Sequence, residues 1–370
     1  MNHACENRFD TVRQKVIDTW IIRRGANKIL LPSHLEASSY QIYNQLQTYE
    51  QLEQYFDGAK QKFQLLWIST SHLIQEVKKN FGTFLVKALN DKKHISNKQV
   101  LSLRMLPFTV HNSEYNFVFQ PVEYYAYLAF SSFLDVPLTS LSGWTLRHLY
   151  DQCGGTMDDG KTLLFPNSAW VSLNLVSYWK WNTEVIFQER NNSKTATTRI
   201  GLVSGASWAI DIPDQRIGSL TDLTSAQIIH ELDEELGING MLTTQKKNFH
   251  DNSNGWVQVI PGGFVISSDR LNPEFLFLGM TAMEFSDIEN FAYKAKDSWE
   301  FKSLRSLDPS QVYRELLRFA QNQESKLNPH AIVSMIATMN TLAVIHELRQ
   351  SSQTIWSHQS RHERRLEGVA

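Results

Sequence analysis

The stretch His230-Glu231-Leu232-Asp233-Glu234-Glu235-Leu236-Gly237-Ile238 places three glutamates at positions i, i+3 and i+4. On a helix, side chains with this spacing lie on one face. Carboxylates held so close together repel one another unless a cation lies between them. A hard divalent cation such as Mg²⁺ takes oxygen ligands and bridges to substrate phosphates. The stretch therefore predicts a metal-binding helix face, with a solvated charged face as the alternative.

The glutamates belong to a helix that we predict to begin near Thr224 and to end at Gly237. Thr224 with Gln227 three residues later has the form of a capping box. Glycine is the usual residue where a helix closes in the left-handed conformation. We expect the glutamates to lie opposite the apolar face of this helix, which consists of Ile228, Ile229, Leu232 and Leu236.

Alternating strand and helix patterns surround this helix, which is typical of an α/β fold. Strands are predicted before it at 170–179, 183–189, 198–203 and 207–212, and after it at 256–267 and 274–281. Further helices are predicted at 286–297, 310–323 and 330–348. The run Pro261-Gly262-Gly263 predicts a tight turn.

The first part of the chain has a different pattern. Helices are predicted at 8–24, 40–56 and 59–89, the last interrupted near Gly82. Residues 90–97 form a polar break. After this break, 101–110 and 115–119 predict strands, and the apolar segment 122–134 fits either a helix or a strand.

Composition excludes several classes of protein. The 370 residues carry a net charge of -2, from 36 basic and 38 acidic side chains, so the overall charge does not favour binding to nucleic acid or to membranes. The two cysteines, Cys5 and Cys153, form no disulfide framework and indicate free thiols in a reducing compartment. No apolar run reaches the length of a membrane span, and the N-terminus lacks the apolar core of a signal peptide. A cytoplasmic protein is expected.

The helix and its flanking strands resemble a Nudix domain. The box of that family reads G-x5-E-x7-R-E-U-x-E-E-x-G-U, where U is aliphatic, and its second half matches each specified position from Glu231 to Ile238. Three earlier positions depart from it. His230 stands in place of the family's Arg, Asp222 in place of its first Glu, and Arg216 in place of its Gly.

The resemblance covers residues 168–319 and implies an α/β/α sandwich around a mixed sheet. Gln188-Glu189-Arg190 ends a strand as in family members, and the run 204–208 stands where a Gly- and Trp-containing approach to the box is expected. The predicted organisation has four parts: a largely helical N-terminal region (1–97), a connecting α+β segment (98–167), a Nudix-like domain (168–325), and a C-terminal helix with a polar tail (326–370).

The resemblance also implies chemistry. Nudix enzymes hydrolyse a nucleoside diphosphate linked to another group, with Mg²⁺ or Mn²⁺ neutralising the phosphates and activating water. Carried over by position, Glu231, Glu234, Glu235 and Asp222 would be metal ligands, and Glu231, Glu235 and His230 would be the catalytic residues. Arg190 would bind substrate phosphate, with a surface ion pair as the alternative. Because a neutral imidazole cannot make the bidentate contact of Arg, activity is expected to be reduced or pH-dependent.

A helical DNA-binding N-terminus is a third, weaker hypothesis, and it would use the loosely clustered basic residues Arg13, Lys15, Arg23, Arg24 and Lys28. Two main functions remain open beside it. One is a Mg²⁺-dependent pyrophosphohydrolase, whose fourth metal-site acid would be Glu284, Asp287 or Glu289. The other is a Nudix-like module that senses a nucleotide or holds a partner without turnover, with the N-terminal region as its output. The expected partner is a nucleotide-type small molecule rather than a membrane or a nucleic acid. A homodimer is compatible with the N-terminal region, and the substrate is not readable from the sequence.

Overall fold

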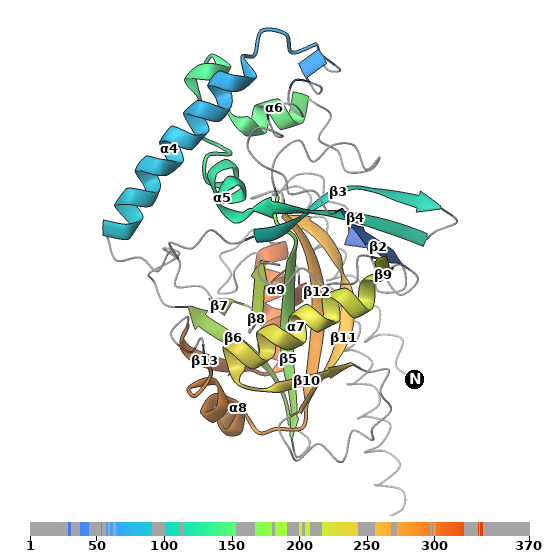
Figure 1. The fold of residues 1–370 in the computed structure, drawn as a ribbon. Helices are drawn as coiled ribbons and strands as arrows, with labels where there is room; N and C mark the ends of the chain where they lie inside the picture. The colour runs from blue at the N-terminus through green and yellow to red at the C-terminus, as the bar shows by residue number, and fades with distance from the viewer. Residues whose placement is uncertain are drawn as a thin grey trace, which may run out of the picture.

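The structure is a computed structural model. It contains two sheets, with helices packed around them (Figure 1). It describes the following residues: 29–30, 38–43, 53, 57, 60–61, 64–90, 101–111, 114–152, 167–179, 182–190, 200–201, 204–207, 217–242, 256–267, 272–296, 298, 301–321, 332 and 334–335. The predicted helix at 8–24 and the polar tail lie outside these residues, as does most of the predicted helix at 330–348.

The larger sheet is mixed. In the part of the chain that the structure describes it has nine strands, with the path β1-β11-β12-β5-β6-β13 and with β10, β7 and β8 attached to β11, β6 and β5. β12 runs parallel to β5 and β10 parallel to β11, whereas the other pairs are antiparallel. The strand bounds are Ile29–Leu30 (β1), Trp170–Trp179 (β5), Asn182–Arg190 (β6), Ile200–Gly201 (β7), Ser204–Ser207 (β8), Asn239–Leu242 (β10), Trp256–Ser267 (β11), Asn272–Thr281 (β12) and Phe301–Leu307 (β13).

Helices cover both faces of this sheet. One face packs against α7 (Leu220–Leu236) and the other against α9 (Pro309–Ala320). Alternation along the strands produces the two cores: in β12, Phe275 and Phe277 belong to the α7 core, and Leu276 and Leu278 belong to the α9 core. The predicted α/β class, with a mixed sheet between helical layers, is confirmed.

A smaller sheet joins segments that are far apart in the sequence. Its order is β3-β4-β2-β9, with bounds Leu101–His111 (β3), Glu114–Glu123 (β4), Ser39–Ile42 (β2) and Ile217–Ser219 (β9). The prediction of a helix from residue 40 is wrong at β2, where Tyr40 and Ile42 are buried on one side of the strand and alternate with more exposed neighbours. Phe117 of β4 packs on Phe264 and Phe275 at ring-centroid distances of 5.3 and 5.6 Å, so both sheets share one core.

A group of helices lies beyond the smaller sheet (Figure 1). It consists of α4 (Thr70–Asn90), α5 (Tyr124–Ser132), the 3-10 helix η1 (Thr139–Leu141) and α6 (Leu146–Gln152), which share a hydrophobic cluster. α4 begins later than predicted and continues through Gly82 without interruption. The ambiguous segment 122–134 is largely helical, as α5.

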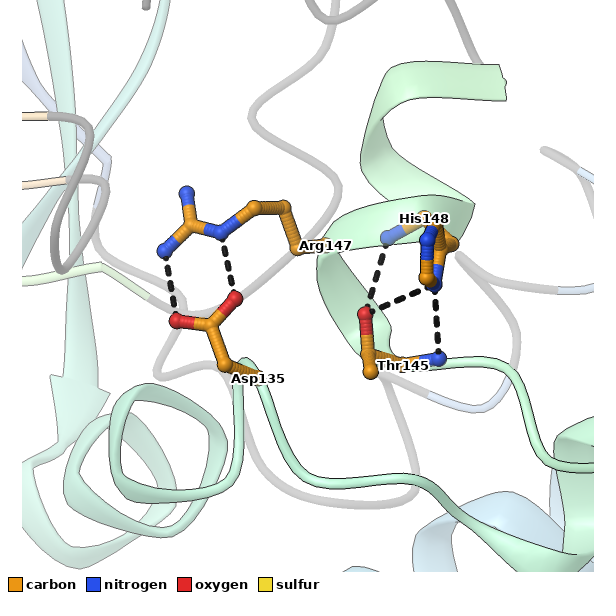
Figure 2. Close-up of polar contacts among 4 residues, drawn as sticks. All are labelled: Asp135, Thr145, Arg147 and His148. Carbon is orange, nitrogen blue, oxygen red and sulfur yellow. Dashed lines mark hydrogen bonds and ion pairs between the residues drawn. The ribbon is translucent and has the colours of Figure 1, made fainter. Parts of the chain in front are cut away.

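Two polar contacts hold α6 in place. Figure 2 shows Arg147 donating to both carboxylate oxygens of Asp135, at 2.5 and 2.9 Å, and these hydrogen bonds lower the pKa of Asp135. Thr145 and His148 bond reciprocally at the helix start: the His148 N–H donates to Thr145 Oγ1 at 3.1 Å, and the Thr145 N–H donates to His148 Nδ1 at 3.3 Å. This is the geometry of a capping box, with His in the third position.

The strands predicted at 101–110, 115–119, 170–179, 183–189, 256–267 and 274–281 are all confirmed within two to four residues at their ends. The predicted turn at Pro261-Gly262-Gly263 is wrong, because this run lies inside β11, where a bulge between Pro261 and Gly263 absorbs the irregularity. Gly263 has φ +141°, a conformation that the missing Cβ permits. Among the described residues, no helix is both long and apolar enough to cross a membrane.

Candidate functional site

The start of α7 differs from the prediction. The helix begins at Leu220, and Ser219 is its N-cap, accepting a hydrogen bond from the Asp222 N–H at 3.4 Å. Thr224 lies inside the helix, where its hydroxyl donates to the Leu220 carbonyl at 2.9 Å. The capping-box prediction at Thr224 is therefore wrong. A threonine hydroxyl inside a helix can donate a hydrogen bond to the carbonyl four residues earlier instead of capping the start of the helix.

The end of α7 is as predicted. Gly237 has φ +64°, and its N–H donates to carbonyls of the last turn. A Cβ at Gly237 would lie 3.2 Å from the Phe291 carbonyl oxygen of α8 (Phe285–Ala292). Glycine is thus required both by the backbone conformation and by the close approach of α8.

Glu231 and Glu235 lie one helical turn apart and are buried, with 6% and 4% of their surface exposed. The prediction that the glutamates lie opposite the apolar face is wrong for these two, which flank Ile228 and Leu232 within the buried face. Gln227 donates to Glu231 Oε1 at 2.8 Å. Buried carboxylates require partners that compensate for lost hydration, so this face is not the solvated one.

Glu234 has a different environment. Its carboxylate accepts a hydrogen bond from the ammonium of Lys296, which follows α8, and it lies 3.6 Å from His230 Nε2. His230 is half-exposed at the surface of α7. The residue that replaces the family's Arg therefore faces Glu234 one turn further along the helix.

Asp222 lies apart from these glutamates along α7, and the backbone of Arg190 lies in the larger sheet. Asp222 is exposed in the first turn of α7, about 13 Å along the helix axis from Glu231. There it lies near Tyr40, whose pKa is raised by burial and further by the Asp222 charge. Arg190 ends β6 opposite Phe301 of β13.

The three acids considered as a fourth ligand belong to the α8 region. Glu284 is the N-cap residue of α8, Asp287 is exposed in its first turn, and Glu289 is half-buried. Arg216, which replaces the first glycine of the box, lies outside the described residues.

The donor set of α7 fits a hard cation in part. Within the described residues, no three or more His, Cys, Asp or Glu side chains are close enough to hold a metal ion together. Mg²⁺ nevertheless requires no more than one or two carboxylates when waters and substrate phosphates complete its shell. The buried pair Glu231 and Glu235 meets this requirement, whereas Glu234 already has Lys296 as its cationic partner.

Sequence patterns did not identify two residues that contact these glutamates, Lys296 and Gln227. They also did not identify Gln188, which is fully buried in β6 on the α7 face of the sheet. Gln227 could have been found, because it is four residues before Glu231 and such pairs meet on a helix. Lys296 is 62 residues from Glu234 along the chain, and no local pattern predicts that contact.

No model of a known protein family matches the sequence, and no curated protein matches it with significance. Similar solved structures include the NUDIX domain of Shewanella oneidensis NrtR, in a cocrystal with ADP ribose, at 10% identity and a TM-score of 0.26, covering 42% of this chain and 88% of that one. A mutT/nudix family protein from Listeria innocua is similar at 11% identity and a TM-score of 0.29, covering 50% and 98%. At such low values the likenesses do not establish membership of the family.

Proposed function

We propose that α7 binds Mg²⁺ or Mn²⁺ and that the protein hydrolyses a nucleoside-diphosphate-linked substrate at this helix. The observation that supports it best is the burial of Glu231 and Glu235 one turn apart on the same face. Two carboxylates held one turn apart on a rigid helix are oxygen ligands of the kind that a hard divalent cation takes. A diphosphate brings further negative charge to such a cation, which would bridge the helix and the substrate.

The residues of α7 have separate roles in this proposal. A bound cation would neutralise the diphosphate and lower the pKa of its water. Gln227 donates to Oε1 of Glu231 and so helps to orient this carboxylate, which would be one ligand of the cation. Glu235 supplies the second carboxylate from the next turn. Lys296 brings positive charge to Glu234, so that Glu234 stays outside the cation's shell.

Three variants of α7 test the proposal. Release of phosphate or nucleoside monophosphate from a panel of nucleoside-diphosphate derivatives, with Mg²⁺ and with Mn²⁺, should fall by about 100-fold or more in Glu231→Gln and Glu235→Gln. Asp233→Asn is the matched control, because Asp233 is an exposed acid of the same helix. Wild-type protein that releases no product from the whole panel with either metal would contradict hydrolysis.

A second function is favoured by one observation, the contact between Lys296 and Glu234. The ammonium of Lys296 supplies to Glu234 the positive charge that a second metal ion would otherwise bring. The protein would then bind a nucleotide without turning it over. Thermal stabilisation by a nucleoside diphosphate and Mg²⁺, with no product formed, is the result expected of this alternative. A measurable turnover number excludes it.

A further inference from the structure

Gln188 in β6 is buried with 0% of its surface exposed, and within the described part of the chain neither its amide nitrogen nor its amide oxygen has a hydrogen-bond partner. An interior amide that bonds to nothing has lost its hydration without compensation. Native proteins contain few such groups, and those that exist call for a reason, among them a role in ligand binding.

The side chain of Gln188 lies on the α7 face of the sheet. Residues of β6 alternate: Val185 and Phe187 belong to the core under α9, and Ile186 belongs to the core under α7. Gln188, two residues after Ile186, therefore shares its side of the sheet. Leu304, directly opposite Gln188 on β13, also belongs to the α7 core.

Gln188 also marks the place where β6 separates from β5. The two strands pair as far as Ile186, which faces Leu175. Beyond that point Gln188 pairs with Gly201 of β7, while Leu173 of β5 pairs with Ser204 of β8.

The helix that carries the buried glutamates, α7, covers this same face of the sheet. Ile229 and Leu232 of α7 lie against β10, since a Cβ on Gly240 would meet both. Glu231 is two residues after Ile229, about 200° around the helix, so it lies on the flank away from β10. α7 also packs against β8 and β5. Gln188 and the helix that carries the two buried glutamates thus lie on the same face of the larger sheet.

We propose that the carboxamide of Gln188 binds the base edge of the nucleotide whose diphosphate is held near Glu231 and Glu235. The inference rests on the proposed function and adds the contact that recognises the nucleoside. A carboxamide presents a donor and an acceptor side by side, and each nucleobase has an edge with a complementary pair. Both orphaned atoms of Gln188 would be satisfied by one such edge.

The experiment compares ligands with and without a base. Binding of ADP, GDP, CDP, UDP and inorganic pyrophosphate is measured by calorimetry with Mg²⁺, for wild type and for Gln188→Met, which keeps the length of the side chain. The tightest nucleoside diphosphate should bind Gln188→Met roughly tenfold more weakly or worse, while the affinity for pyrophosphate stays unchanged. The melting temperature of the ligand-free variant should rise, because the orphaned amide is gone.

Ser225→Ala is the matched control. Ser225 is also fully buried with a hydroxyl that has no partner among the described residues, but it lies one turn before Ile229 on the flank facing β10. Its variant should bind every probe as wild type does. The inference is overturned if Gln188→Met binds nucleoside diphosphates as tightly as wild type does. It is also overturned if the affinity of this variant for pyrophosphate falls by the same factor as its affinity for nucleoside diphosphates. Wild-type protein that binds neither kind of probe refutes the proposed function as well.

Discussion

Lys296 donates a hydrogen bond to the carboxylate of Glu234, joining the segment after α8 to the last turn of α7. The same carboxylate lies 3.6 Å from His230 Nε2. The three glutamates therefore have two environments: Glu231 and Glu235 are buried, and Glu234 is partly buried beside the ammonium of Lys296. A metal on α7 would compete with Lys296 for the nearby negative charge.

Replacing Lys296 with Met should strengthen metal binding. The ammonium repels a divalent cation at the neighbouring glutamates, and its removal also frees Glu234 to turn toward the metal. Because the side chain of Lys296 is 71% exposed, water screens much of this effect. We expect the Mn²⁺ dissociation constant to fall about two- to fivefold, measured by titration with paramagnetic resonance detection. Lys294→Met, an exposed lysine two residues earlier, should leave that constant unchanged.

Packing of α7 on β10 determines the distance between the sheet and the helix that carries the glutamates. A Cβ on Gly240 would lie 2.8 Å from Ile229 Cγ1 and 3.3 Å from the Ile229 Cα, so the helix backbone itself would have to shift. Gly240→Ala should lower the free energy of unfolding by about 1–3 kcal/mol in urea titrations and should weaken Mn²⁺ binding.

Gly82→Ala serves as the opposite case. Gly82 lies within α4, and a Cβ there would have no heavy atom within 4 Å. Alanine should therefore raise the free energy of unfolding by about 0.5–1 kcal/mol. Equal stability of both variants would show that the close approach at Gly240 is not what constrains α7.

Much of the larger sheet was predictable from the sequence because its strands are long apolar runs. β5 and β11 have the predicted bounds, since runs such as Trp170–Trp179 are too apolar for a surface segment and are bounded by polar turns. β2 was not predictable: four residues form a strand there because β4 and β9 offer them hydrogen bonds on both sides. Local pattern contains no information about such distant partners.

The site was predictable as a sequence motif but not as an environment. Spacing placed the three glutamates on one helix correctly, but charge in a sequence is normally taken to mean exposure, and Glu231 and Glu235 are buried. Their burial depends on how α7 packs in the tertiary fold, which local sequence does not specify. For the same reason the orphaned amide of Gln188 was not visible until the strands were paired.

A hydrogen bond connects the helical group to the larger sheet. The Asn272 side-chain amide of β12 donates to the Tyr127 hydroxyl of α5 at 2.7 Å, and both residues are buried. Tyr127→Phe removes the acceptor and should cost about 1–2 kcal/mol of unfolding free energy. The exposed Tyr43 provides a control, because Tyr43→Phe should change stability by less than about 0.5 kcal/mol. If both variants unfold at the wild-type urea midpoint, the contact does not stabilise the fold.

The start of α9 should make stability depend on pH. Asp308 caps this helix: its Oδ1 accepts from the Ser310 and Gln311 N–H groups at 2.8 and 3.1 Å, and the Asp308 N–H donates to Oε1 of Gln311. The hydrogen bond from the Ser310 side chain, followed by those from the backbone, lowers the pKa of Asp308. A lowered pKa means that the charged carboxylate stabilises the fold above the ordinary pKa of aspartate, and that this stability is lost as the pH falls through the lower folded value.

Two variants separate the cap from its charge. Asp308→Ala should lose about 1 kcal/mol at pH 7, because the helix N-terminus loses its acceptor. Asp308→Asn keeps an acceptor oxygen that does not titrate, so its stability relative to wild type should improve as the pH is lowered from about 5 to about 3. Urea unfolding at a series of pH values measures both. A constant difference between wild type and Asp308→Asn across this range would show that the carboxylate charge contributes nothing to the cap.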